Sequence, residues 1–131
     1  MVTGRPTGLT RRAVLAAAVL AVATRAAQAW SGSAPRVAAI DWAMAETALA
    51  LGHAPVAIAE LLRFRPVAPV QPPMDTVDLG LRGAPNLEAL SLAGPDLILS
   101  SNYYSFIEQR LATLGPVFSR TLYVPREAPF P

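Results

Sequence analysis

The chain lacks cysteine and lysine and has a single histidine, His53, among its 131 residues. Without cysteine it can form no disulfide, and it has no thiol to carry a lipid anchor. One histidine with no cysteine beside it does not complete a metal site, because a zinc centre needs three or four such ligands. We expect His53, which follows Gly52 at a predicted helix end, to meet free backbone carbonyls; a metal-ligand role is the alternative.

Common catalytic motifs are absent as well. The sequence has no Gly-x-Ser-x-Gly elbow, no Gly-x-Gly-x-x-Gly turn and no phosphate-binding loop. Asp75 and Asp78 are close in sequence, but the turn residues around them favour a solvated loop over a general acid and base. We therefore predict that the protein is not an enzyme. The rival hypothesis is an exported hydrolase with Ser100 or Ser101 as nucleophile and His53 as base.

The first 29 residues are typical of a cleavable export signal. Arg11 and Arg12 precede an uncharged apolar run over residues 13–24, and small residues lead to Ala29, after which we expect cleavage. A helix of that run would rise about 18 Å, which is too short for the ~30 Å core of a bilayer. The paired arginines favour a twin-arginine signal; an ordinary secretory signal is the alternative.

Residues 30–131 remain as one small domain with a slightly acidic balance. Four of the 11 basic residues lie in the signal, so seven arginines stand against nine acidic residues. That balance removes the case for a nucleic-acid partner, which the basic charge of the whole chain would suggest. The length suits a single domain that can bury a core. We predict a soluble exported protein that is not anchored to a membrane.

Hydrophobic patterning predicts alternating strands and helices. We expect strands at residues 36–40, 56–59 and 96–100, a brief strand or turn at 77–80, and a last strand at 121–124. Helices are expected over 42–51, over 87–93 and after Ser105. The proline-rich stretch 63–74 is predicted to be an extended loop. This alternation predicts an α/β, Rossmann-like lobe with a mainly parallel sheet and helices on both faces.

The predicted helices carry recognisable start and stop signals. Asp41 precedes the first helix and Asn86 the second, and each can accept hydrogen bonds from the first free amides. Ser105 and Glu108 have the Ser-x-x-Glu spacing of a capping box for the third helix. Gly94, which a proline follows, is predicted to end the second helix.

In a sheet of this kind, ligands bind beyond the carboxyl ends of the strands. The residues just after the predicted strands include Arg82, Tyr103, Tyr104 and Trp42. A guanidinium can donate paired hydrogen bonds to polarised oxygens, and aromatic rings can cover an organic scaffold. This set predicts recognition of a polar small molecule. The alternatives are a surface ion pair for Arg82, one core and one exposed tyrosine, and simple packing for Trp42.

Two stretches of the sequence resemble a known family. RVAAIDWAMAETALALG at residues 36–52 and DLGLRGAPNLEALSLAGPDLILSS at residues 78–101 resemble the N-terminal lobe of periplasmic iron-siderophore binding proteins. The block GLR-x-x-PNLE followed by PDLIL is typical of the wider family. GLR together with DW resembles its ferric-hydroxamate, or ferrichrome, binders. The likeness runs from about Arg36 to the end of the chain.

The resemblance implies a substrate-binding component of an ABC importer. Such a protein captures an iron(III)–siderophore in the periplasm and delivers it to an inner-membrane permease with its ATPase. Arg82 and one tyrosine, Tyr103 or Tyr104, would contact the hydroxamate oxygens. The siderophore supplies the iron ligands, so neither a covalent cofactor nor a protein metal ligand is implied. A single arginine also suits a nearly neutral hydroxamate complex better than a triply anionic catecholate.

Glu88 is similar to the acid through which such lobes dock onto arginines of the permease. The alternative is a first-turn glutamate favoured by the helix dipole.

The sequence also departs from the family pattern. Members have two lobes joined by a long helix, with the ligand between them, so we expect residues 30–131 to be a truncated N-terminal lobe; a lobe that works with a separate partner chain is the alternative. Residues 65–68 stand where the family has a tryptophan, which leaves the particular siderophore open. A haem or cobalamin binder of the same fold and a stand-alone interaction module are the other hypotheses.

Overall fold

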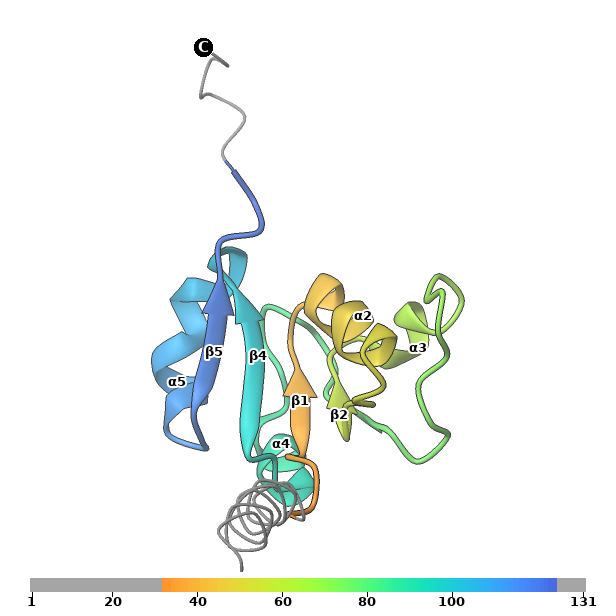
Figure 1. Ribbon diagram of the computed structural model, residues 1–131. Helices are drawn as coiled ribbons and strands as arrows, with labels where there is room; N and C mark the ends of the chain where they lie inside the picture. Colours follow the sequence, from red (N-terminus) through yellow and green to blue (C-terminus); the bar gives the residue numbers. More distant parts are fainter. Residues whose placement is uncertain (1–31, 125–131) are drawn as a thin grey trace, which may run out of the picture. The chain divides into compact units, whose positions relative to one another are not determined.

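The computed structural model describes residues 32–124, and the predicted signal at 1–29 lies outside these residues. Within them, one five-stranded sheet has the order β3-β2-β1-β4-β5 (Figure 1). Every neighbouring pair of strands is parallel. The strands are β1 (Val37–Ala39), β2 (Ala57–Ile58), β3 (Val77–Asp78), β4 (Leu97–Ser101) and β5 (Val117–Arg120). The predicted α/β fold with a parallel sheet is confirmed.

Helices cover both faces of the sheet, because each parallel connection has to cross over it. They are α2 (Trp42–Ala50), α3 (Leu61–Phe64), α4 (Leu87–Ala93), the 3-10 helix η1 (Asn102–Ile107) and α5 (Glu108–Ala112). α2 and α3 pack on one face, and α4, η1 and α5 pack on the other (Figure 1). Among residues 32–124, no helix has the length and apolar character that a membrane span requires.

Alternating strand side chains build one core on each face of the sheet. On β1, Val37 and Ala39 belong to the core under α2, while Ala38 belongs to the core under α4 and α5. Phe64 fills the first core and Leu90 the second, and both are fully buried. Each such large side chain contributes about 1.5–3 kcal/mol to folding through its burial. The two cores hold the strand ends in place and so position the residues that follow them.

Two of the predicted helix caps are confirmed. Asp41 Oδ1 accepts hydrogen bonds from the backbone amides of Ala43 at 2.8 Å and Met44 at 3.3 Å. Asn86 Oδ1 accepts one from the amide three residues further on, at 3.0 Å. α4 ends as predicted at Gly94, whose φ of 56° is left-handed and suits glycine.

The predicted capping box at Ser105 and Glu108 is wrong. Ser105 lies inside η1, and α5 begins at Glu108 with Ile107 in the N-cap position and no side-chain cap hydrogen bond. Tyr104 and Ile107, three residues apart, are both buried. That spacing matches the period of a 3-10 helix. Burial of these two side chains in the core therefore favours a 3-10 turn over the predicted polar cap.

Two further boundaries differ from the prediction. The last strand is β5, not residues 121–124, because the parallel pairing with β4 ends at Arg120. The stretch 63–74, predicted as an extended loop, begins inside α3. Leu61 and Phe64 of α3 are both buried at helical spacing, and this packing overrides the proline-rich composition that follows.

Candidate ligand-binding site

The strand order brings the predicted site residues to one edge of the sheet. β1 and β4 are neighbours although they are not consecutive in the chain, so their connections leave in opposite directions. Doubly wound sheets bind their ligands at such a switch point. Trp42 follows β1, Arg82 follows β3, and Tyr103 and Tyr104 follow β4. All four therefore lie at the carboxyl edge.

Arg82 makes both an ion pair and an aromatic contact. Its Nε donates a hydrogen bond to Glu60 Oε2 at 2.9 Å, and its Cζ lies 4.2 Å from the centroid of the Trp42 ring. A guanidinium over an indole face gains cation–π stabilisation. The terminal Nη groups of Arg82 have no hydrogen-bond partner within residues 32–124. Arg82 thus forms the ion pair of the alternative interpretation and still keeps donors for a ligand.

Trp42 is fixed by the protein interior. Its Nε1 donates a hydrogen bond of 2.9 Å to the carbonyl oxygen of Ala59, which ties the start of α2 to the end of β2. Its ring also lies 5.5 Å from that of Phe64, at an angle of 56°. Phe64 is fully buried. Trp42 therefore packs against the interior and presents a ring face to Arg82, and its contact with a ligand stays a prediction.

The two tyrosines occupy different environments. Tyr104 is 4% exposed and belongs to the core, whereas Tyr103 is 65% exposed. Their rings meet edge to face with centroids 5.1 Å apart, a favourable aromatic geometry. This is the arrangement of one core and one exposed residue, yet both side chains border the same pocket beside Arg82.

A pocket of about 360 Å³ lies over this edge. Its lining residues are Glu60, Arg82, Gly83, Tyr103, Tyr104 and Phe106. The lining joins one cation, one carboxylate and three aromatic side chains, with no paired nucleophile and base among them. The volume is near the lower end of small-molecule sites, which span about 300–1,000 Å³. Such a surface suits recognition of a polar organic molecule.

The buried carboxylate of Asp41 holds three segments of the site together through hydrogen bonds. Besides capping α2, it accepts through Oδ2 hydrogen bonds from Ser101 Oγ at 2.9 Å and from the Tyr123 hydroxyl at 3.1 Å. Asp41 and Ser101 are fully buried. A single carboxylate therefore joins the end of β4, the start of α2 and the segment after β5.

Tyr123 is a residue of this edge that sequence reasoning missed. Its ring meets that of Tyr103 edge to face at 5.8 Å. Asn102 holds the same segment, because its Oδ1 accepts from the amides of Leu122 at 3.0 Å and Tyr123 at 3.2 Å. Its Nδ2 donates to the Tyr123 carbonyl at 2.7 Å. The sequence pattern had placed Tyr123 within a strand, whereas it follows the carboxyl end of β5, where site residues are expected.

Burial raises the pKa of the Tyr104 and Tyr123 phenols above their ordinary value of 10.0. For Tyr104, the positive charge of Arg82 opposes this rise in pKa and the negative charge of Asp41 adds to it. For Tyr123, the charge and the hydrogen bond of Asp41 raise the pKa further. Both phenols therefore stay protonated at neutral pH and can act as hydrogen-bond donors.

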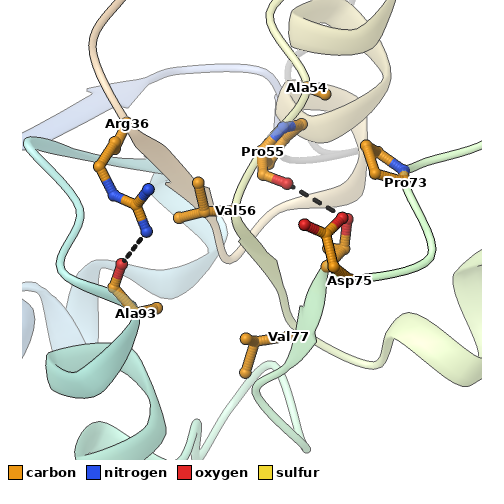
Figure 2. Close-up of a pocket in the computed structure, with 9 residues that line it drawn as sticks. Arg36, Ala54, Pro55, Val56, Pro73, Asp75, Val77 and Ala93 are labelled. Carbon is orange, nitrogen blue, oxygen red and sulfur yellow. Dashed lines mark hydrogen bonds between the residues drawn. The ribbon is translucent and has the colours of Figure 1, made fainter.

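A second pocket, of about 270 Å³, lies at the amino ends of the strands and has a structural role. Figure 2 shows Arg36 hydrogen-bonded to Ala93 on one side of this pocket. Arg36 Nη2 donates to the Ala93 carbonyl at 2.8 Å, and Nε donates to the Gly94 carbonyl at 3.2 Å. These bonds satisfy the carboxyl end of α4. Asp75 also lines the pocket and is exposed. The guanidinium is already occupied, so we do not place the ligand here.

The other predicted candidates do not line the carboxyl-edge pocket. Glu88 is exposed in the first turn of α4. His53 is exposed beyond α2, and residues 32–124 contain no cluster of three metal-ligating side chains. Ser100 and Ser101 are buried, and Ser101 donates to Asp41. No hydrogen bond joins either serine to His53 in the described part of the chain, so a hydrolase arrangement is not formed there.

A cation and several aromatic rings lie at the carboxyl edge of a doubly wound sheet, which is where small-molecule sites occur in this kind of fold. In sequence, the chain is 34% identical over 82 residues to the iron(3+)-hydroxamate-binding protein FhuD of Escherichia coli. The solved structure of the siderophore-binding protein FhuD from Vibrio cholerae, bound to Fe3+–Desferal, matches with 30% identity and a TM-score of 0.60. SirA of Staphylococcus aureus, complexed with staphyloferrin B, matches with 27% identity and a TM-score of 0.56. No protein-family model matches the chain.

These matches cover most of this chain but only about a third of each relative. The shares are 62% of this chain and 28% of the Escherichia coli protein, 66% and 33% for the Vibrio cholerae protein, and 73% and 34% for SirA. The chain is homologous to iron-siderophore binding proteins over the matched part and shares their fold. The predicted resemblance is therefore confirmed.

Proposed function

We propose that the protein is the substrate-binding component of an ABC importer that captures an iron(III)–siderophore of the hydroxamate type. The observation that carries this proposal is the Arg82 guanidinium, which is held at the carboxyl edge with unpaired Nη donors. Its support comes from homology to a hydroxamate-binding protein and from the fold shared with siderophore-binding proteins. The protein carries out no chemistry on the ligand in this proposal.

The chemistry of a ferric hydroxamate matches these groups. The siderophore fills the coordination sphere of iron(III), so the protein needs to recognise only the outer surface of the complex. Hydroxamate oxygens are polarised and accept hydrogen bonds, which the Arg82 Nη groups and the protonated Tyr104 phenol can donate. The exposed rings of Tyr103 and Phe106 cover the organic scaffold.

The described residues provide one wall of the site in this proposal. A site that binds a molecule of this size tightly buries 70–90% or more of its surface, by the usual measure of ligand pockets. Within residues 32–124, the pocket over Arg82 is lined from one side only, by residues at the carboxyl edge of the sheet. We therefore propose that tight binding needs a facing lobe, and that the 131-residue chain alone binds weakly.

Export and delivery are further parts of the proposal. The predicted signal at residues 1–29 would send the protein to the periplasm without an anchor. Glu88 is exposed and can meet a permease arginine. Glu88→Gln should then weaken association with the permease and leave siderophore binding unchanged, as measured by pull-down and titration. Equal association of both forms would remove Glu88 from the docking surface.

The test of the main proposal is a fluorescence titration of the full chain in a Trp30→Phe background, so that Trp42 alone reports. Ferrichrome and ferrioxamine are added, with haemin and cobalamin in parallel for the same-fold alternative. We expect saturable quenching by the hydroxamates that Arg82→Ala weakens about tenfold or more, as loss of a charged hydrogen-bond donor would. Arg110→Ala, an exposed arginine on α5, is the matched control. Preference for a tetrapyrrole, or equal quenching in Arg82→Ala, would refute the hydroxamate site.

A further inference from the structure

Glu60 was not among the predicted site residues, and its backbone is unusual. With φ of 51° and ψ of 42°, it is the only non-glycine residue with a positive φ in residues 32–124. A left-handed conformation is unfavourable for a residue with a Cβ atom, and glycine would relieve it. Backbone strain of this kind tends to persist where a side chain has a functional task.

The turn that carries Glu60 is clamped to the turn that carries Arg82. The Glu60 amide donates to the Gly80 carbonyl at 2.6 Å. Asp78 Oδ1 accepts from the amides of Leu61 at 3.2 Å and Gly80 at 2.9 Å. These bonds fix the end of β2 against the end of β3. The backbones that carry the two charged side chains are therefore held close together.

The pairing of Glu60 with Arg82 leaves the terminal donors of the arginine available. The carboxylate, whose side chain is 14% exposed, accepts from Nε at 2.9 Å. Because Nε lies nearest the aliphatic stem, this bond and the Trp42 face together restrict rotation of the guanidinium. Both Nη groups remain unpaired within the described residues. Glu60 thus orients the cation without occupying the atoms that a ligand would use.

The same carboxylate changes the charge of the site. Glu60 balances the charge of Arg82, and the carboxyl edge of the sheet also holds the buried carboxylate of Asp41, which accepts hydrogen bonds from Ser101 and Tyr123. The described lining of the pocket contains no second cation. A polyanionic ligand would therefore meet no net positive charge, which makes its approach unfavourable.

We propose that Glu60 is a positioning and selectivity residue, which orients Arg82 and makes the site prefer neutral or cationic ferric complexes to polyanionic ones. This inference rests on the proposed function. The proposed function assigns recognition to Arg82 alone, whereas here the Glu60 carboxylate cancels the charge of Arg82. Selectivity for the charge of the ligand therefore depends on both residues.

The test compares the full chain with Glu60→Gln, Glu60→Gly and Asp75→Asn. Neutral ferrichrome, cationic ferrioxamine B and a triply anionic ferric tris-catecholate are titrated at low salt. Removing the Glu60 charge should raise affinity for the trianion about tenfold relative to ferrichrome. This factor is the Coulomb repulsion in water between one carboxylate and three ligand charges about 8 Å away. Asp75→Asn makes the same charge change at the opposite edge and should shift the preference far less, because the interaction falls with distance. Glu60→Gly also removes the carboxylate, but it relieves the left-handed backbone strain and should fold. If it shows the same altered preference as Glu60→Gln, the loss of charge and not a loss of folding is the cause. An unchanged preference in both Glu60 variants overturns the inference.

A second readout needs no ligand and separates this inference from the proposed function. In NMR spectra of the full chain, the Arg82 Nε–H should exchange with water several-fold faster in Glu60→Gln than in the wild type, because its acceptor is weakened. If no ferric complex binds the wild-type chain even at the highest soluble ligand concentration, the weak binding that the proposed function expects of this chain fails, while faster exchange still supports the positioning role. Unchanged exchange overturns that role whether or not a ligand binds.

Discussion

Ser101 Oγ donates a hydrogen bond of 2.9 Å to Asp41 Oδ2, and both residues are fully buried. The bond joins the end of β4 to the first turn of α2, 60 residues apart in the chain. These elements meet because β4 pairs directly with β1. At the topological switch point of the sheet, Asp41 therefore both links the two strand ends by a hydrogen bond and caps α2.

Asp41→Ala should lower the free energy of unfolding by about 2–4 kcal/mol, because it removes a helix cap and leaves the Ser101 hydroxyl buried without its acceptor. Ser101→Ala should cost about 1 kcal/mol, since the carboxylate keeps its other donors. Urea denaturation followed by circular dichroism measures both values. A cost for Asp41→Ala no greater than that for Ser101→Ala would show that the carboxylate is not the centre of the network.

Tyr123→Phe should reduce the loss of stability at alkaline pH. Burial and the charge and hydrogen bond of Asp41 raise the folded-state pKa of Tyr123 above 10.0. The folded protein therefore keeps a proton that the unfolded chain loses above pH 10.0. This contribution to stability is complete below pH 10.0 and is lost as the pH rises through the folded-state pKa.

The measurement is the free energy of unfolding between about pH 9 and about pH 11, where tyrosine titrates. The chain has no lysine to titrate in the same range, which simplifies the comparison. The wild-type value should fall more steeply with pH than that of Tyr123→Phe. Parallel declines in the two proteins would contradict the proposed origin of the shift.

Asn102→Ala should release the segment after β5. The Asn102 side chain makes three hydrogen bonds to the backbone of Leu122 and Tyr123. Without them, the amides of both residues should exchange faster in hydrogen-exchange measurements, and global stability should fall by about 1 kcal/mol. The amides of β1, the central strand, serve as the control, because any change in their exchange should reflect only the small fall in global stability. Unchanged exchange at Leu122 and Tyr123 would mean that Asn102 does not hold the segment.

The two helix starts that look alike in sequence should respond differently to truncation. Asn86→Ala should cost about 1 kcal/mol, because Asn86 Oδ1 accepts a hydrogen bond from the first turn of α4. Ser105→Ala should change stability by less than about 0.5 kcal/mol, because Ser105 is exposed inside η1 and caps no helix. Thermal unfolding of the two variants tests this. Equal costs would restore the capping box predicted for Ser105.

Local sequence signals were sufficient for most of the fold. The strand before Asp41, the cap at Asn86 and the stop at Gly94 each depend on a few adjacent residues, and all agree with the structure. The misplaced elements had local signals that packing overrode. Ser105 had the spacing of a cap, but the burial of Tyr104 set a 3-10 turn there.

The types of residue at the carboxyl ends of the strands were also evident from sequence. Arg82 and Trp42 could be nominated because they follow predicted strands, which is a local property. Whether they meet depends on the order of strands in the sheet, which juxtaposes chain segments far apart in sequence. The contact between Arg82 and Trp42 therefore follows from tertiary packing and not from their separation in sequence.

Only the tertiary structure decided how the site is braced and charged. Glu60 lies 22 residues from Arg82, and Tyr123 lies 82 residues from Asp41. No local pattern marks either pair, because each depends on which strand ends become neighbours and on which side chains the core leaves at the surface. The chain's own residues supplied the chemical groups, and the strand order determined their partners, since hydrogen bonds and ion pairs require proximity in space.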